Sequence, residues 1–158
     1  MINKLRVRAQ SESGFTLVEL LVVMLILGLL AAIAIPSFFN QRDKARDADA
    51  KEQVRTAQTA IETYATDHDG HYTGAISDPT GADPDSLQAI ESVLRDTGTR
   101  LDVVSATDDS YEVAVTSTND SEGAGAMVFS IARNSDGTLE YTCVEDGADG
   151  CPSGGNWD

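Results

Sequence analysis

The fold of this chain is decided by the stretch Gly14-Phe15-Thr16-Leu17-Val18-Glu19 and by the apolar run that follows it to Pro36. The 22 residues from Leu20 to Gln41 carry no formal charge, and an apolar segment of that length can cross the hydrocarbon core of a membrane as a helix. One carboxylate, Glu19, stands immediately before this segment. A carboxylate there costs free energy unless a nearby positive group neutralises it. We therefore expect a membrane-spanning stem in which Glu19 is a functional residue.

Charge is distributed unevenly along the 158 residues, whose net charge is -15. Residues 1–14 carry a side-chain sum of +2, residues 42–55 hold five basic and four acidic groups, and residues 56–158 hold three arginines against twenty acids. Basic residues before an apolar segment favour a cytoplasmic N-terminus, so the acidic region is expected outside the membrane. Such a region disfavours nonspecific binding of nucleic acid, and no specific nucleic-acid partner is predicted.

Three interpretations compete for the first 36 residues. The first is an ordinary signal peptide cleaved after Ala32-Ile33-Ala34, although Glu19 would then lie inside its apolar core. The second is a plain single-pass anchor with Glu19 near the interface. The third places a cut between Gly14 and Phe15, which gives Phe15 a free amine with a pKa near ~8. Glu19 lies one helical turn later and could complement that amine in its own chain or in a neighbour, or could simply cap the helix.

The sequence from Ser13 to Val23 resembles the N-terminal processing signature of type IV prepilins and of the related pseudopilins of type II secretion, and residues 26–36 are similar to the rest of that family's stem. The resemblance implies that a membrane aspartyl peptidase cuts after Gly14 and methylates the new amine of Phe15. It also implies that Glu19 pairs with the N-terminus of a neighbouring subunit during filament assembly.

Two further stem residues, Gly28 and Pro36, weaken a helix by about 1 and 3 kcal/mol respectively. Gly28 could serve only close helix packing, and Pro36 could produce only a kink. The resemblance implies a larger role in assembly, since the segment between such a glycine and proline can lose helicity in a type IV pilus.

Beyond Pro36 the sequence turns polar but predicts that the helix continues to about Asp67, with Gly70 as a stop signal. Apolar residues recur at spacings of three and four and predict one buried stripe: Ala50, Val54, Ala57, Ile61, Tyr64 and Ala65. Alternating charges before and among them indicate a solvated face, or ion pairs between subunits of an assembly: Arg42, Asp43, Lys44, Arg46, Asp47, Asp49, Lys51 and Glu52.

Residues 70–158 predict a small globular head. A short helix is expected over Asp85–Asp96, with Asp85 or Ser86 as its cap and Leu87, Ile90, Val93 and Leu94 on one face. Four strands are expected at Leu101–Ser105, Tyr111–Ser117, Ala126–Arg133 and Thr138–Cys143. Their short links favour an antiparallel meander that buries the helix stripe, which is an α+β fold. A long helix on a small antiparallel sheet is also what the resemblance implies.

The only two cysteines, Cys143 and Cys151, are expected to form a disulfide, because an even pair in an extracytoplasmic region favours one. The crosslink would stabilise the head by roughly 2–3 kcal/mol and pin the glycine-rich end of the chain to the last strand. In pilins such a disulfide often bounds a variable surface loop, so this segment could carry surface identity or binding.

Weaker signals are two histidines, a fragment of a calcium loop, an acidic C-terminal end and a glycosylation sequon: His68, His71, Asp67-x-Asp69-Gly70, Glu145, Asp146, Asp149, Asp158 and Asn119-Asp120-Ser121. None has a spacing diagnostic of a metal site. We predict no catalytic residues, no metal and no cofactor.

These patterns together predict a leader at residues 1–14, an N-terminal helix at 15–69 whose part 15–41 lies in the membrane or filament core, and a head at 70–158. The function expected is that of a structural subunit of a type IV pilus. Its partners would be identical subunits, the prepilin peptidase and methyltransferase, and the inner-membrane assembly machinery, first in the plasma membrane and then in an extracellular filament. Such a filament would serve adhesion, motility or DNA uptake. The alternatives are a type II secretion pseudopilin and a membrane-anchored binding domain that never polymerises.

Overall fold

The computed structural model describes residues 14–118, 127–144 and 150–158. The predicted leader up to residue 13, the glycosylation sequon, the first residue of the third predicted strand and three of the four C-terminal acids lie outside these ranges: Asn119, Ala126, Glu145, Asp146 and Asp149 are among them. The chain divides into two compact units, Met1–Phe38 and Phe39–Asp158. Each unit is described by itself below.

The N-terminal helix, α1, runs over Leu17–Asp67. It begins two residues after Phe15 and ends at Asp67, where the apolar periodicity predicted its end, two residues short of the expected bound at residue 69. The end follows from backbone conformation, because Asp69 and Gly70 both adopt positive φ (57° and 89°) and the Gly70 N–H donates to the Ala65 carbonyl at 2.8 Å. Such a left-handed stop is typical of helix C-termini. Pro36 lies inside the helix.

The apolar stripe predicted for the second half of α1 is buried in the structure. All six of its residues are at most 5% exposed: Ala50, Val54, Ala57, Ile61, Tyr64 and Ala65. Facing them are fully buried side chains of the second and third strands, which complete the core: Tyr111, Val113, Val115, Phe129 and Ile131.

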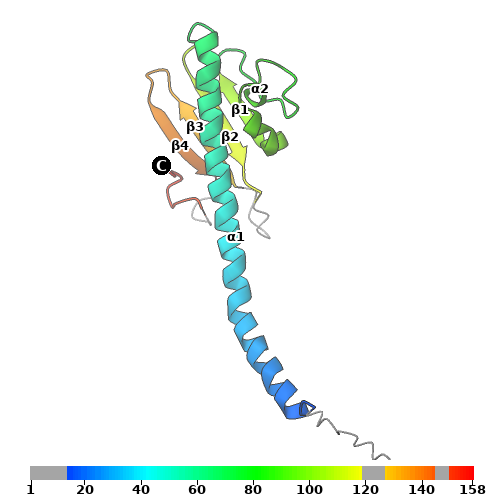
Figure 1. Ribbon diagram of the computed structural model, residues 1–158. Coiled ribbons are helices and arrows are strands. Elements are labelled where there is room, and N and C mark those ends of the chain that lie inside the picture. The colour runs from blue at the N-terminus through cyan, green and yellow to red at the C-terminus, as the bar shows by residue number, and fades with distance from the viewer. Residues whose placement is uncertain (1–13, 119–126, 145–149) are drawn as a thin grey trace, which may run out of the picture. The chain divides into compact units, whose positions relative to one another are not determined.

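The head contains one four-stranded antiparallel sheet in the order β1-β2-β3-β4. Its strands are β1 (Leu101–Ala106), β2 (Tyr111–Thr116), β3 (Val128–Arg133) and β4 (Leu139–Val144). Neighbours in sequence are neighbours in space, so the meander is confirmed, with strand ends within one or two residues of those expected. The C-terminal part of α1 crosses one face of this sheet (Figure 1). The chain therefore has the predicted α+β fold.

The single short helix expected over Asp85–Asp96 is wrong. The structure has a four-residue helix, α2 (Leu87–Ile90), and then a 3-10 helix, η1 (Ser92–Arg100), separated by Glu91 in an extended conformation. Ser86 does cap α2, since its Oγ accepts from the Ala89 N–H at 3.2 Å.

Tertiary contacts explain this break between α2 and η1. The guanidinium Nε of Arg95 donates to the Gln88 carbonyl at 3.2 Å. This bond satisfies a carbonyl that would otherwise need a backbone N–H from the next turn of a continuing helix. Leu94 is buried, whereas Val93 stays 59% exposed instead of joining the predicted apolar face.

A carboxylate of α1 ties the helix to the sheet. Glu62 accepts hydrogen bonds from the hydroxyls of Tyr72 and Tyr111, each at 2.9 Å, and lies 3.6 Å from the Arg133 guanidinium. The two phenol rings meet edge to face with centroids 4.7 Å apart. Burial, followed by the bond to Glu62, raises the pKa of both tyrosines above the usual 10.0.

Candidate functional site

The first candidate site is the segment Gly14–Glu19, which enters α1. Gly14, Phe15 and Thr16 precede the first helical residue and are exposed. The Thr16 hydroxyl accepts a hydrogen bond from the Glu19 N–H at 3.2 Å, and its carbonyl accepts from the Leu20 N–H at 3.2 Å. Thr16 is thus the N-terminal cap of the helix. The Gly14–Phe15 peptide bond lies just outside the helical hydrogen-bond ladder.

Glu19 occupies the third helical position, in the first turn of α1. A carboxylate is favourable there because the free N–H groups of a helix start carry partial positive charge. Its side chain is exposed, and within the described part of the chain it has no ion-pair partner. The Thr16-x-x-Glu19 spacing is also the signature of a capping box, a signal that the sequence analysis did not use.

The apolar run after Glu19 is exposed along its whole length. From Leu17 to Phe39, large apolar side chains are 46–77% exposed, and this is the helix long and apolar enough to cross a membrane among the residues searched. Monomeric soluble proteins rarely expose so large an apolar surface. Gly28 lies in this run with open space around its Cα, and Pro36 follows near its end. A membrane or a partner must cover the surface.

The second candidate site is the C-terminal tail, here residues 150–158, with the disulfide that holds it. Cys143 at the end of β4 is bonded to Cys151, with their Cα atoms 5.9 Å apart. The predicted disulfide is confirmed. After it the tail returns along β4, where the Cys143 N–H donates to the Gly155 carbonyl at 2.8 Å.

Trp157 is the anchor of this tail, and the sequence analysis missed it. Its indole is only 6% exposed, and its Nε1–H donates to the carbonyls of Thr142 and Ser130 at 2.8 and 3.3 Å. The ring meets Phe129 and Tyr141 edge to face. The signal in the sequence was the single tryptophan itself, because so large an apolar side chain is rarely left in water.

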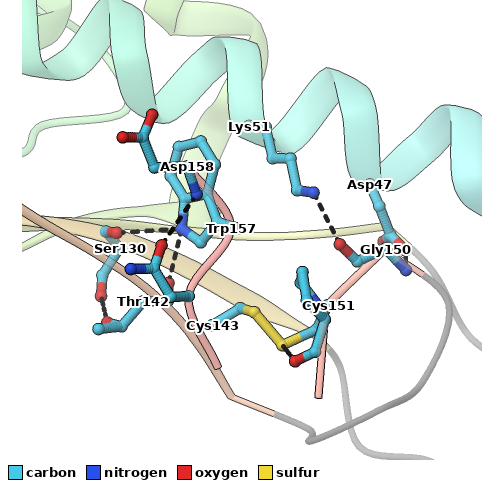
Figure 2. The surroundings of a disulfide bond; sticks show 11 residues. Asp47, Lys51, Ser130, Thr142, Cys143, Gly150, Cys151, Trp157 and Asp158 are labelled. Atoms are coloured by element: carbon cyan, nitrogen blue, oxygen red, sulfur yellow. Dashed lines mark hydrogen bonds between the residues drawn. A yellow bond between two sulfur atoms is a disulfide. The ribbon is translucent and has the colours of Figure 1, made fainter. Parts of the chain in front are cut away.

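Asp47 corrects the expectation that the alternating charges form a solvated face. It is 1% exposed, and its two carboxylate oxygens accept from the Ser117 hydroxyl at 2.7 Å and from the Gly150 N–H at 3.0 Å. One turn later the Lys51 ammonium donates to the Gly150 carbonyl at 2.7 Å. Figure 2 shows these α1 side chains directed at the tail next to the disulfide. Asp47 and Lys51 of α1 therefore bind both backbone polar groups of Gly150, its N–H and its carbonyl.

Two cations of α1 cover the aromatic anchor. The Lys51 ammonium lies 5.1 Å from the Phe129 ring centre and 5.7 Å from that of Trp157, and the Arg55 guanidinium lies 5.2 Å from the latter. Burial lowers the pKa of Lys51, and the nearby Asp47 carboxylate opposes that effect. These cation–π contacts stabilise the packing of the tail against α1.

Of the weaker signals, the two histidines lie on the surface of the head. His68 stacks on the Tyr64 ring and lies 3.7 Å from Asp85, whereas His71 lies 4.0 Å from Asp108. The structure thus places the two histidines with different carboxylates. Among the described residues, no three His, Cys, Asp or Glu side chains converge as metal ligands.

Comparison with known proteins places the first site in a family context. The profile described as "Prokaryotic N-terminal methylation motif" matches residues 10–35. Type II secretion system core protein G of Pseudomonas aeruginosa is 37% identical over 59 residues, which are 37% of this chain and 42% of the relative. Type IV major pilin protein PilA of Myxococcus xanthus is 39% identical over 56 residues, 35% of this chain and 26% of the relative.

A longer but weaker similarity reaches into the head. A fimbrial protein of Pseudomonas aeruginosa is 27% identical over 135 residues, which are 85% of this chain and 69% of the relative. The chain thus spans less than half the length of the first two relatives, and a little over two thirds of the third. The strongest identities come with short alignments.

Proposed function

Because this chain is a type IV pilin-like protein, we propose that it is a structural subunit of a type IV pilus and not an enzyme. The observation that carries the proposal is the exposed apolar surface that follows Glu19 and reaches Phe39. In a membrane that surface is covered by lipid, and in a filament it is covered by the same surface of neighbouring copies. Either environment removes apolar area from water, worth about 25 cal/mol per Å².

Maturation comes first in this proposal. A membrane peptidase cuts between Gly14 and Phe15 and a methyl group is added to the new amine of Phe15. The position of this bond before the first helical residue supports the assignment, because an exposed, non-helical backbone can enter a protease cleft. The match of residues 10–35 to the methylation motif supports it independently.

Assembly follows through Glu19, for which the described part of the chain supplies no cation. In the proposal its carboxylate pairs with the amine of Phe15 in a neighbouring copy, while each helix slides into the core of the filament. Desolvation in that core would make the pair stronger than in water. Gly28 and Pro36 would let the helix unwind locally there.

The cellular path is also part of the proposal. The chain would first span the plasma membrane once, with its acidic head outside, and meet the peptidase and the assembly machinery there. The assembled filament would then be extracellular. A second candidate, a pseudopilin subunit of a type II secretion system, is favoured by the similarity to core protein G.

The decisive experiment has three readouts in cells that express the chain. Mass spectrometry of the mature N-terminus should find methylated Phe15, whereas a start at Ile35 would refute prepilin processing. Shearing should release fibres containing the chain, whereas retention of all the protein with the cells would favour the pseudopilin. Glu19→Ala should abolish sheared fibres without reducing membrane insertion, and Asp67→Ala, at an exposed acid on the same helix, should leave both unchanged.

A further inference from the structure

The buried stripe of α1 separates two exposed flanks of opposite charge. Successive positions of a helix are about 100° apart, so residues just after stripe positions lie on one side and residues just before them lie on the other. Lys51 and Arg55 follow Ala50 and Val54, whereas Asp49 precedes Ala50. From Asp49 to Arg55 the alternation of charge along the sequence therefore becomes a separation of charge around the helix, whereas Arg46, on the same side as Asp49, is paired with Asp43 at 3.8 Å.

The side after the stripe, here called the basic flank, consists of Lys44, Lys51 and Arg55 around the exposed Ala48. Ala48, Lys51 and Arg55 line a hollow of about 340 Å³ together with Glu52 and Trp157. Arg55 keeps 57% of its side chain exposed and has one distant acidic neighbour, Asp158 at 3.9 Å. Lys44 is exposed and has no partner among the described residues.

The side before the stripe, here called the acidic flank, consists of Asp49, Glu52 and Asp96. They line a second hollow of about 190 Å³ together with Gln53, Thr56 and Val93. Val93 leaves an apolar side chain 59% exposed in this acidic setting. Neither Asp49 nor Asp96 forms an ion pair within the described part of the chain. Glu52 borders both hollows.

Positive charge is scarce elsewhere on the head. Residues 56–158 contain three arginines, and each is engaged internally. Arg95 bonds the Gln88 carbonyl, Arg100 bonds the Thr116 carbonyl and Arg133 faces Glu62. With twenty acids in the same stretch, heads of separate copies repel one another unless the basic flank of one meets an acidic surface of the next.

We propose that the basic flank of one copy docks against the acidic flank of a second copy. The two surfaces lie on opposite sides of one helix, so each copy keeps one flank of each sign free for the next. Such a heterologous contact propagates into a helical array. Val93 would enter the apolar edge of the contact beside Ala48. This inference rests on the proposed assembly of identical subunits and specifies which head surfaces meet in it.

The first experiment is charge reversal with rescue in the full chain, read as the amount of sheared fibre. Lys44→Glu and Arg55→Glu should each lower fibre yield several-fold, since one exposed ion pair changes an equilibrium by up to roughly fivefold. Lys44 is exposed and forms no hydrogen bond or ion pair with the described residues, so its variant also guards against misfolding. Adding Asp49→Lys to Arg55→Glu should restore the yield, because the reversed charge at position 55 then meets a reversed charge at position 49 of the next copy. Asp109→Lys, in the exposed turn between β1 and β2, is the matched control and should have no effect.

The second experiment is crosslinking, and it does not depend on fibre formation. Copies carrying Ala48→Cys and copies carrying Val93→Cys are produced together and treated with a short bis-maleimide. Mixed dimers should exceed Ala48→Cys homodimers several-fold. Fibres of normal yield in Lys44→Glu and Arg55→Glu, without mixed dimers, would overturn the docking but leave the pilus subunit intact.

The remaining outcomes also decide the question. A wild type that is never released by shearing but still gives mixed dimers would refute the pilus and keep the flank contact. If neither fibres nor mixed dimers are found, the pilus proposal and the docking proposal are both overturned. A loss in the basic-flank variants that Asp49→Lys cannot rescue would assign that flank to anionic lipid headgroups, and would also overturn docking between copies.

Discussion

Replacing Asp47 by alanine should destabilise the head by about 3 kcal/mol. The buried carboxylate accepts two hydrogen bonds, from Ser117 at 2.7 Å and from Gly150 at 3.0 Å. Hydrogen bonds to a charged group are worth about 1.5–3 kcal/mol each. Relief from burying the charge offsets part of that sum. The Lys51 ammonium, whose pKa is lowered by burial, would also lose the Asp47 carboxylate that opposes that effect.

The assay for Asp47→Ala is urea unfolding of the full chain in detergent micelles, followed by the fluorescence of Trp157, the only tryptophan. With an m-value of about 2 kcal/mol per M, the midpoint should fall by about 1.5 M. Asp49→Ala, two residues later and exposed, is the matched control and should change stability by less than about 0.5 kcal/mol. Equal midpoints for the two variants would refute the reasoning that the Asp47 contacts fasten the tail to the helix.

Three further predictions concern the disulfide and two titrating groups. Replacing Cys143 and Cys151 by alanine together should cost about 2–3 kcal/mol in the same assay, and a loss below about 1 kcal/mol would contradict a stabilising crosslink. The pKa of Tyr111 is raised above 10.0 by burial above all, so its contribution is complete below pH 10 and is lost as the pH rises further. Unfolding midpoints of the wild type should fall above pH 10, and those of Tyr111→Phe should fall less steeply. Equal slopes for the two proteins above pH 10 would contradict this role of Tyr111. Hydrogen bonds, first that from the Thr80 N–H, lower the pKa of Asp78 from 3.8 to about 2, so its contribution is present above pH 4 and is lost as the pH falls through 2. Asp78→Asn should flatten this acid limb in a pH titration of the midpoint, and an unchanged limb would contradict the assignment.

Much of the fold could be predicted because its signals are local. The stripe from Ala50 to Ala65 follows the helical period, and the four strands alternate and are separated by short turns. Gly70 also indicated the end of the helix, because glycine adopts positive φ readily. The break between α2 and η1 could not be predicted, because it depends on Arg95 reaching back to Gln88, a tertiary contact that overrides a locally adequate helical pattern.

The candidate sites also differ in whether their signals are local in the sequence. Gly14, Phe15 and Glu19 lie within one six-residue segment, so the sequence alone could propose them as site residues. The docking of the C-terminal tail was missed because its contacts join distant parts of the chain. Trp157 bonds carbonyls of β3 and β4, and no short-range spacing connects an aromatic residue to backbone groups 15 and 27 positions earlier.

Asp47 shows how far helical periodicity could have gone. It lies three residues before Ala50 and seven before Val54, which is the spacing of the stripe, so the same rule that buries those residues predicts a buried carboxylate. A buried charge needs donors, and that requirement alone distinguishes Asp47 from the neighbouring acids. Its donors, Ser117 and Gly150, stand 70 and 103 positions away and only the folded chain identifies them. The helical period of the stripe thus indicates that the Asp47 carboxylate must be paired, and only the tertiary structure identifies its donors.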